Sequence, residues 1–264
     1  MKTEYQGQMI RQTQRHEKCF HMVLQTDAQL IEQAIPGQFV HLRVTGEGTP
    51  FLRRPFSIHR VNPEEQTLEL LYAVVGQGTR RMAESLEGQR FNLLGPLGTG
   101  FPDPPAGSRR VVLVGGGMGI APLLFAADVL KKRSFQLVII MGFPSEDHIV
   151  CRNAFDELEA EVMIATEDGS AGFKGLPTDL LRMKLGENGT DTVFACGPSA
   201  MMESVKMTCE KTRTPAWISM EERMACGVGA CLGCVVTVKD NGVTVYRKAC
   251  VDGPVFAAAE VIFP

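Results

Sequence analysis

The stretch Val111-Val-Leu-Val-Gly-Gly-Gly-Met-Gly-Ile-Ala-Pro-Leu123 decides the fold of the second half of the chain. Its apolar residues predict a buried strand, its glycines a tight turn, and the residues from Ile120 onward a helix. Glycines let a pyrophosphate approach the backbone, and a helix N-terminus offers it free N–H groups. The stretch departs from GxGxxG, so a purely architectural turn is the alternative. The candidate binding residues of this turn are Gly115, Gly116, Gly117 and Gly119.

The 20 residues 111–130 contain a single charge and GxxxG spacing, which also fits a membrane-spanning helix. Three consecutive glycines and Pro122 would interrupt such a helix, so the membrane interpretation is disfavoured. The first residues of the chain have no apolar core typical of a signal peptide. We therefore expect a soluble, cytoplasmic protein.

Downstream of the glycine turn, apolar runs alternate with helical patterns. Strands are predicted at 136–141, 161–166, 192–195 and 217–220, and helices at 120–132, 151–159, 178–185 and 199–211. Strands that alternate with helices of this length predict a parallel sheet covered on both faces. This αβ domain is expected over residues 101–220.

Upstream of the turn, apolar and polar residues alternate with a period of two. Strands are predicted at 20–24, 40–44, 57–61 and 67–75, with one short helix at 79–86. Short strands in close succession are typical of a small antiparallel barrel, which we place at residues 1–100. A segment rich in glycine and proline, residues 95–107, marks the boundary to the αβ domain.

The predicted barrel carries a candidate flavin site at Arg54-Pro55-Phe56-Ser57. Arginine pairs with phosphate, phenylalanine stacks on planar rings, and serine hydrogen-bonds to ring nitrogens. An Arg-Pro-Phe strand edge with a purely structural role is the alternative. Gly76-Gln-Gly78-Thr79, directly before the predicted helix, is a second candidate anion site.

Four of the eight cysteines crowd near the C-terminus as Cys226-x4-Cys231-x2-Cys234, followed after 15 residues by Cys250. This spacing is the plant-type arrangement for a 2Fe–2S cluster. A hairpin predicted at 235–239 and 243–247, with Asn241-Gly242 at its turn, returns the chain so that the four thiolates can meet at its base. Structural zinc and disulfides are the alternatives. A small cluster domain is therefore expected over residues 221–264.

The overall charge excludes one class of partner. Lys plus Arg number 27 and Asp plus Glu number 30, which gives a formal net charge of −3. No long-range positive field would attract nucleic acid.

Taken together, these motifs resemble those of the ferredoxin–NADP reductase superfamily over nearly the whole length of the chain. That family joins a flavin-binding barrel to a nicotinamide-binding αβ domain, and its Arg-x-Tyr/Phe-Ser signature is similar to residues 54–57 here. The resemblance implies Arg54 on the flavin phosphates, Phe56 against the isoalloxazine ring and Ser57 near its N5. Further residues similar to the family's FAD-contacting stretches are Leu71, Tyr72, Ala73, Gly78 and Thr79. Those similar to its pyridine-nucleotide sites are the glycines of the 115–119 turn and Cys196, Gly197 and Pro198, with the cysteine beside the nicotinamide.

The stretches Glu221-Glu-Arg-Met-Ala-Cys226 to Cys234 and Ala249-Cys250-Val-Asp-Gly-Pro254-Val-Phe256 resemble one subfamily more closely, the electron transfer subunits of NAD-type dihydroorotate dehydrogenase B. The resemblance implies a 2Fe–2S cluster on the four cysteines and a catalytic partner subunit that carries FMN and oxidises dihydroorotate in pyrimidine biosynthesis. It further implies a heterotetramer of two copies of each subunit. Electrons would pass from the partner's FMN through the cluster and FAD to NAD+, and no residue of this chain is assigned a catalytic acid–base role.

NAD is favoured over NADP because Met141-Gly-Phe-Pro-Ser-Glu-Asp147 offers no Arg or Lys to a 2′-phosphate. Glu167-Asp168-Gly169-Ser170 is expected in the same cleft, with solvated loop carboxylates as the alternative. Two other functions stay open at this point. One is a related subunit of a ferredoxin-linked NAD(P) oxidoreductase or a sulfide dehydrogenase. The other is a zinc-stabilised binding module without enzymatic activity.

Overall fold

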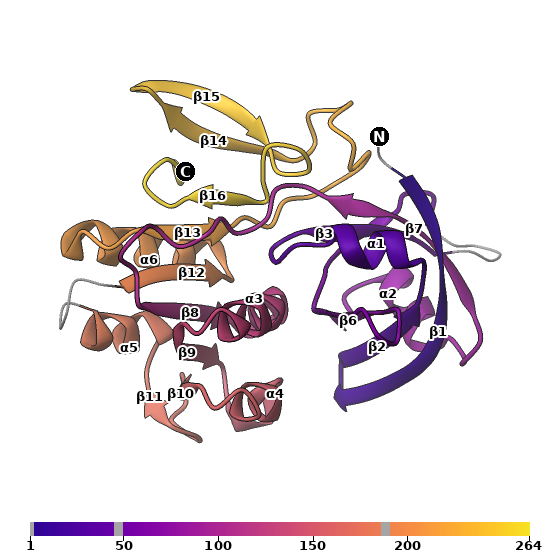
Figure 1. The fold of residues 1–264 in the computed structure, drawn as a ribbon, viewed down its shortest axis with the longest axis horizontal. Helices are drawn as coiled ribbons and strands as arrows, with labels where there is room; N and C mark the ends of the chain where they lie inside the picture. The colour runs from indigo at the N-terminus through magenta and orange to yellow at the C-terminus, as the bar shows by residue number, and fades with distance from the viewer. Residues whose placement is uncertain (1–2, 45–49, 186–190) are drawn as a thin grey trace.

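The computed structural model describes residues 3–44, 50–185 and 191–264. Two sheets lie side by side, and the C-terminal hairpin lies beyond β16, the edge strand of the second sheet, with its base toward the first sheet (Figure 1). The antiparallel sheet comes from the first part of the chain and the mainly parallel sheet from the second, as the sequence predicts.

The first sheet has the strand order β4-β3-β7-β1-β2-β6-β5, and its neighbours pair antiparallel. Its strands are β1 (Thr3–His16), β2 (Cys19–Gln25), β3 (Phe39–Arg43), β4 (Arg54–Ser57), β5 (Arg60–Asn62), β6 (Thr67–Ala73) and β7 (Arg90–Leu97), with helices α1 (Ala28–Gln33) and α2 (Gln77–Ala83). Alternate residues such as Leu68 and Leu70 of β6 fill its interior with Met22 and Leu24 of β2. This packing confirms the antiparallel barrel.

The single strand predicted at 57–61 is wrong, because the chain changes partner within it. Ser57 still pairs with β3, and the Ile58 N–H donates to the Gln38 carbonyl at 3.0 Å. The next residue, His59, instead donates its N–H to the Glu69 carbonyl of β6 at 2.9 Å. The two edge strands of the sheet, β4 and β5, are thus consecutive in the chain. The short connection between them brings the two edges together and curls the sheet into a barrel.

The second sheet has the order β11-β10-β9-β8-β12-β13-β16, parallel except for β16. Its strands are β8 (Arg110–Gly116), β9 (Gln136–Phe143), β10 (Glu161–Thr166), β11 (Phe173–Lys174), β12 (Asp191–Cys196), β13 (Ala216–Ser219) and β16 (Val255–Ala257). Its helices are η1 (Gly117–Ile120), α3 (Ala121–Lys132), η2 (Glu146–His148), α4 (Arg152–Asp156), α5 (Pro177–Lys184) and α6 (Ser199–Thr212). The helix predicted at 151–159 is therefore shorter than expected.

Helices cover both faces of this sheet, which explains the unbroken apolar run of β8. Val111 and Leu113 pack in one core with α3 and α4. Val112 and Val114 pack in the opposite core with α5 and α6. A strand buried on both faces has no polar side, as expected for a parallel sheet. No helix of the described residues is long and apolar enough to cross a membrane.

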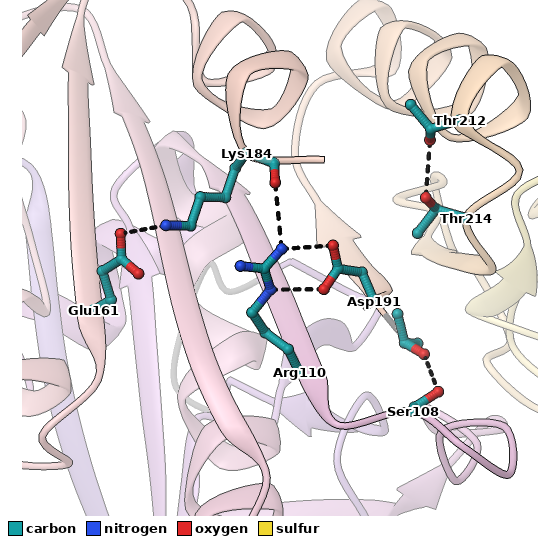
Figure 2. Close-up of polar contacts among 8 residues, drawn as sticks. Ser108, Arg110, Glu161, Lys184, Asp191, Thr212 and Thr214 are labelled. Carbon is teal, nitrogen blue, oxygen red and sulfur yellow. Dashed lines mark hydrogen bonds and ion pairs between the residues drawn. The ribbon is translucent and has the colours of Figure 1, made fainter. Parts of the chain in front are cut away.

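A polar network links the amino ends of β8 and β12, at the opposite end of β8 from the glycine turn (Figure 2). Arg110, at the start of β8, donates two hydrogen bonds of 2.6 and 2.7 Å to the Asp191 carboxylate at the start of β12. The Asp191 side chain is 3% exposed. Lys184 adds its carbonyl to Arg110 at 3.3 Å and its ammonium to Glu161 at 2.8 Å.

The C-terminal unit contains the predicted hairpin, β14 (Val235–Asp240) and β15 (Val243–Lys248). After Cys250 the chain returns to the second sheet, where β16 pairs antiparallel with β13. Cys234, Val236 and Cys250 share one hydrophobic core with Val193 of β12. The boundaries placed at residues 100 and 220 stay predictions, since the last unit adds a strand to the sheet of the second.

Candidate cofactor sites

The glycine turn lies at the carboxyl end of β8, where the order of the sheet reverses. From β8 the chain passes to β9 on one side, while β12 pairs with β8 on the other. Ligands of open αβ sheets bind in the crevice at such a switch point. Here Gly115 is in register with Cys196, so the turn and the Cys196-Gly197-Pro198 loop lie next to each other.

The two loops approach so closely that only glycine fits at their contact. A Cβ on Gly119 would lie 2.3 Å from the Cys196 carbonyl oxygen, and one on Gly115 would lie 2.6 Å from the Ile120 Cδ1. Gly197, with φ of +159°, would place a Cβ 3.1 Å from the Gly116 nitrogen. These glycines therefore shape the turn through backbone packing.

A cavity of about 360 Å³ opens in front of these loops. Of the predicted nucleotide residues, Gly116, Gly117 and Pro198 line it. Gly115, Gly119, Cys196 and Gly197 are not among its lining residues. Cys196 is 1% exposed, and burial together with the charge of Glu221 raises the pKa of its thiol.

The acidic loops predicted for this cleft meet at its rim. Glu167 lines the cavity, as do Phe143 and Pro144 at the end of β9. The Glu146 N–H donates to the Ser170 hydroxyl at 2.7 Å, which joins the two loops. No Lys or Arg is among the described residues that line this cavity.

A second cavity, of about 420 Å³, lies beside the barrel. Most of the predicted flavin residues line it: Arg54, Pro55, Phe56, Ser57, Leu71, Tyr72, Ala73 and Thr79. The Phe56 and Tyr72 rings meet edge to face with centroids 5.6 Å apart. Gly78 lies behind Arg54, because a Cβ there would be 3.1 Å from the guanidinium Nε.

Two of these residues are hydrogen-bonded within their own loops. The Arg54 Nη1 donates to the carbonyls of Leu52 at 2.5 Å and Arg53 at 3.2 Å. The Thr79 hydroxyl donates to the Gly76 carbonyl at 3.1 Å and accepts the N–H of Val75 at 3.0 Å. Thr79 therefore fixes the start of α2, whereas the Arg54 guanidinium lies at the cavity wall.

The far wall of this second cavity comes from the other two units. Met118, within the glycine turn, and Ala121, at the start of α3, belong to this wall, so η1 lies between the two cavities. The segment Ser219 to Glu222 and Met224 leads into the first cysteine, and Pro254 follows the last. Burial raises the pKa of Glu221 in this wall. Sequence patterns do not identify these residues, because they approach the barrel only through the tertiary fold.

The four cysteines gather at the base of the hairpin as two pairs. In the first pair, the Cys226 and Cys231 sulfurs are 3.3 Å apart, and the Cys231 N–H points at the Cys226 sulfur at 3.4 Å. Burial would raise the pKa of Cys226, but the N–H groups of Val228, Cys231 and Ala230 together with the Cys231 thiol outweigh it and hold that pKa at about 6. Such a thiol is readily present as the thiolate that metals bind.

The second pair, Cys234 and Cys250, is 1% and 0% exposed. Burial and a hydrogen bond between the two side chains raise the pKa of Cys250 to about 11, and the charge of Cys226 also acts on it. Two pairs of thiols fit a cluster of two irons, each of which takes two of them, better than one tetrahedral zinc. Among the described residues, no three metal-ligating side chains are grouped as around a single ion.

A flavin-type barrel, a nucleotide-binding sheet and a four-cysteine loop together define an iron–sulfur flavoprotein reductase of the ferredoxin–NADP reductase fold. A solved structure of an NADH-dependent reduced ferredoxin–NADP oxidoreductase, studied for flavin-based electron bifurcation, matches 97% of this chain and 89% of its own. The TM-score is 0.85 and the sequence identity 30%.

The family models agree with the two later units. Residues 113–207 match the oxidoreductase NAD-binding domain, and residues 221–262 match the iron–sulfur cluster binding domain of dihydroorotate dehydrogenase B. The electron transfer subunit of dihydroorotate dehydrogenase B (NAD+) from Desulforamulus reducens is 41% identical over 87% of both chains. Its counterpart from Shouchella clausii is 37% identical over 96% of both. The chain belongs to the family of dihydroorotate dehydrogenase B electron transfer subunits and is an oxidoreductase component.

Proposed function

We propose that this chain carries electrons between the FMN of a catalytic partner subunit, which oxidises dihydroorotate, and NAD+. The observation that supports this most directly is the 420 Å³ cavity, which the barrel, the glycine turn and the segments flanking the cysteines all line. Nicotinamide exchanges a hydride, an iron–sulfur cluster passes single electrons, and a flavin does both. A flavin in this cavity would thus have the nucleotide site on one side and the cluster loop on the other.

The residues of this chain bind and orient the cofactors. For FAD we propose Arg54 at the phosphates, Phe56 and Tyr72 against the rings, and Ser57 at the ring edge. For NAD we propose the glycine turn and the 196–198 loop, with the acidic rim disfavouring a 2′-phosphate. For the 2Fe–2S cluster we propose Cys226, Cys231, Cys234 and Cys250 as ligands.

The names of the relatives support the choice of partner. Each is an electron transfer subunit of dihydroorotate dehydrogenase B, which implies a separate catalytic subunit. We propose an assembly of two copies of each subunit, located in the cytoplasm, with a role in pyrimidine biosynthesis. A ferredoxin-linked oxidoreductase subunit is the second candidate, because the 30% identical structure bears that description.

Replacement of Cys231 by Ser tests the proposal. We expect NADH to reduce the flavin of the C231S variant at the rate of the unaltered chain, because Cys231 is absent from both cavity linings. Turnover of dihydroorotate with NAD+, measured with the partner subunit present, should fall at least about tenfold, as for a lost metal ligand or its support. C151S is the matched control, since Cys151 lies outside the cysteine pairs.

Unaltered dihydroorotate–NAD+ turnover in C231S would refute the route through the cluster. If the unaltered chain instead co-purifies with a ferredoxin-linked partner and supports no dihydroorotate oxidation, the second candidate replaces the first.

A further inference from the structure

A histidine of the barrel touches the loop that carries the first cysteine. His41 lies in the middle of β3, where its neighbours Val40 and Leu42 point into the barrel core. Phe39, two residues away on the other face, packs in the core that contains Cys234 and Cys250. The face of β3 that carries Phe39 and His41 is therefore the barrel's contact with the cluster unit.

The imidazole of His41 packs directly against the backbone of Gly227. A Cβ on Gly227 would lie 2.4 Å from the His41 Nδ1 and 2.9 Å from its Cε1. Gly227 also has φ of +67°, a conformation that favours glycine. Because Gly227 directly follows Cys226, the ring lies within one residue of a cysteine of the first pair.

His41 is completely buried, and its ring nitrogens lie near the backbone of Arg53 and Cys226 without forming a hydrogen bond of good geometry there. In either protonation state an imidazole carries at least one N–H donor. Leaving such a group unsatisfied in the interior costs about 1–3 kcal/mol, so a partner is expected in the loaded protein.

His41 also lies next to the strand that carries the flavin site. His41 is the register partner of Pro55 in β4, and Pro55 lines the cavity assigned to FAD. One residue of the barrel thus connects the flavin-binding strand with the cysteine loop.

We propose that His41 is a positioning residue for the iron–sulfur cluster. Its ring holds the backbone at Gly227 against the flavin-binding strand, and its N–H donates a hydrogen bond to the cluster loop once the cluster is bound. Donors near the sulfurs stabilise the added negative charge of the reduced cluster and raise its reduction potential. The proposal rests on the proposed cluster site.

Redox titration of the reconstituted full-length chain, followed by electron paramagnetic resonance, tests this role. H41F fills the space without a donor, and H41N keeps an N–H donor near the position of Nδ1. We expect H41F to disfavour reduction of the cluster about tenfold, a fall of ~59 mV for one electron, and to change the resonance of the reduced cluster. In H41N the reduction potential of the cluster should fall by no more than half as much as in H41F. H21Q is the control, because His21 is a buried barrel histidine hydrogen-bonded to Glu69. The reduction potential of the cluster in H21Q should equal that of the unaltered chain.

An H41F variant with unaltered iron content, potential and resonance would overturn the proposal. Equal shifts in H41F and H41N would also overturn the donor role, since packing alone would then explain them. A chain that binds no iron even with His41 in place would instead refute the proposed cluster site, so the two failures are distinguishable.

Discussion

Replacement of Gly119 by Ala should damage the nucleotide site selectively. The added methyl would lie 2.3 Å from the carbonyl oxygen and 2.5 Å from the carbonyl carbon of Cys196, and ordinary contact begins at 3.4 Å. Both obstacles are backbone atoms, so the glycine turn and the 196–198 loop must separate by about 1 Å to reach van der Waals contact. Overpacking of this kind costs about 1–3 kcal/mol of stability. A displacement of ~1 Å at a hydride-transfer site can cost roughly 100-fold in rate.

Two measurements separate the expected effects. Urea unfolding gives the stability loss, and stopped-flow reduction of the bound flavin by NADH gives the rate and the apparent affinity for NADH. The flavin and iron contents of G119A should equal those of the unaltered chain, because the barrel and the segments flanking the cysteines supply most of the flavin cavity.

Gly117 is the matched comparison within the same turn. A Cβ there would meet nothing within 4 Å, although φ of +54° adds strain, at about 1–2 kcal/mol. G117A should therefore lose some stability but reduce flavin much faster than G119A. Flavin reduction in G119A at the unaltered rate would refute the role of this close approach.

Three further predictions concern the sheet, the flavin and the cysteine loop. D191A leaves the Arg110 side chain, which is only 15% exposed, without its carboxylate, and this should cost about 3–5 kcal/mol in urea unfolding. A loss under about 1 kcal/mol would show that the ion pair is not needed. R54A removes a charged hydrogen-bond donor from the wall of the flavin cavity, worth about 1.5–3 kcal/mol. FAD should therefore dissociate roughly 10- to 100-fold more readily in a flavin-release assay. Full retention of FAD in R54A would contradict the proposed role of Arg54. G227A should reduce the iron content, because its methyl meets the His41 ring and φ of +67° strains alanine. The double variant G227A/H41A should regain only part of the iron, since the strain remains. A double variant as poor as G227A would exclude the contact with His41 as a cause.

The parts of the fold that follow local patterns could be predicted from the sequence. The alternation of strands and helices after the glycine turn indicates the parallel sheet, and Asn241-Gly242 indicates the hairpin. The spacing of the cysteines indicates a cluster loop, which the family model for residues 221–262 confirms. Each of these signals lies within a few consecutive residues or in a fixed short period.

The parts that depend on contacts between distant segments could not be predicted. The change of partner between Ile58 and His59 breaks a strand whose alternation looks continuous. The return of β16 to β13 and the packing of His41 on Gly227 join segments far apart in the chain. Glu221 and Met118 reach the flavin cavity for the same reason, since a wall assembled from three units leaves no local pattern.

One copy of this chain is expected to hold a flavin and a 2Fe–2S cluster together. The most direct test is the visible spectrum of the chain purified without oxygen, with iron, acid-labile sulfide and flavin assayed on the same sample. We predict flavin bands over broad iron–sulfur absorption, with about two irons and two sulfides per FAD. A colourless protein that contains zinc, and that takes up neither iron nor flavin on reconstitution, would contradict the account.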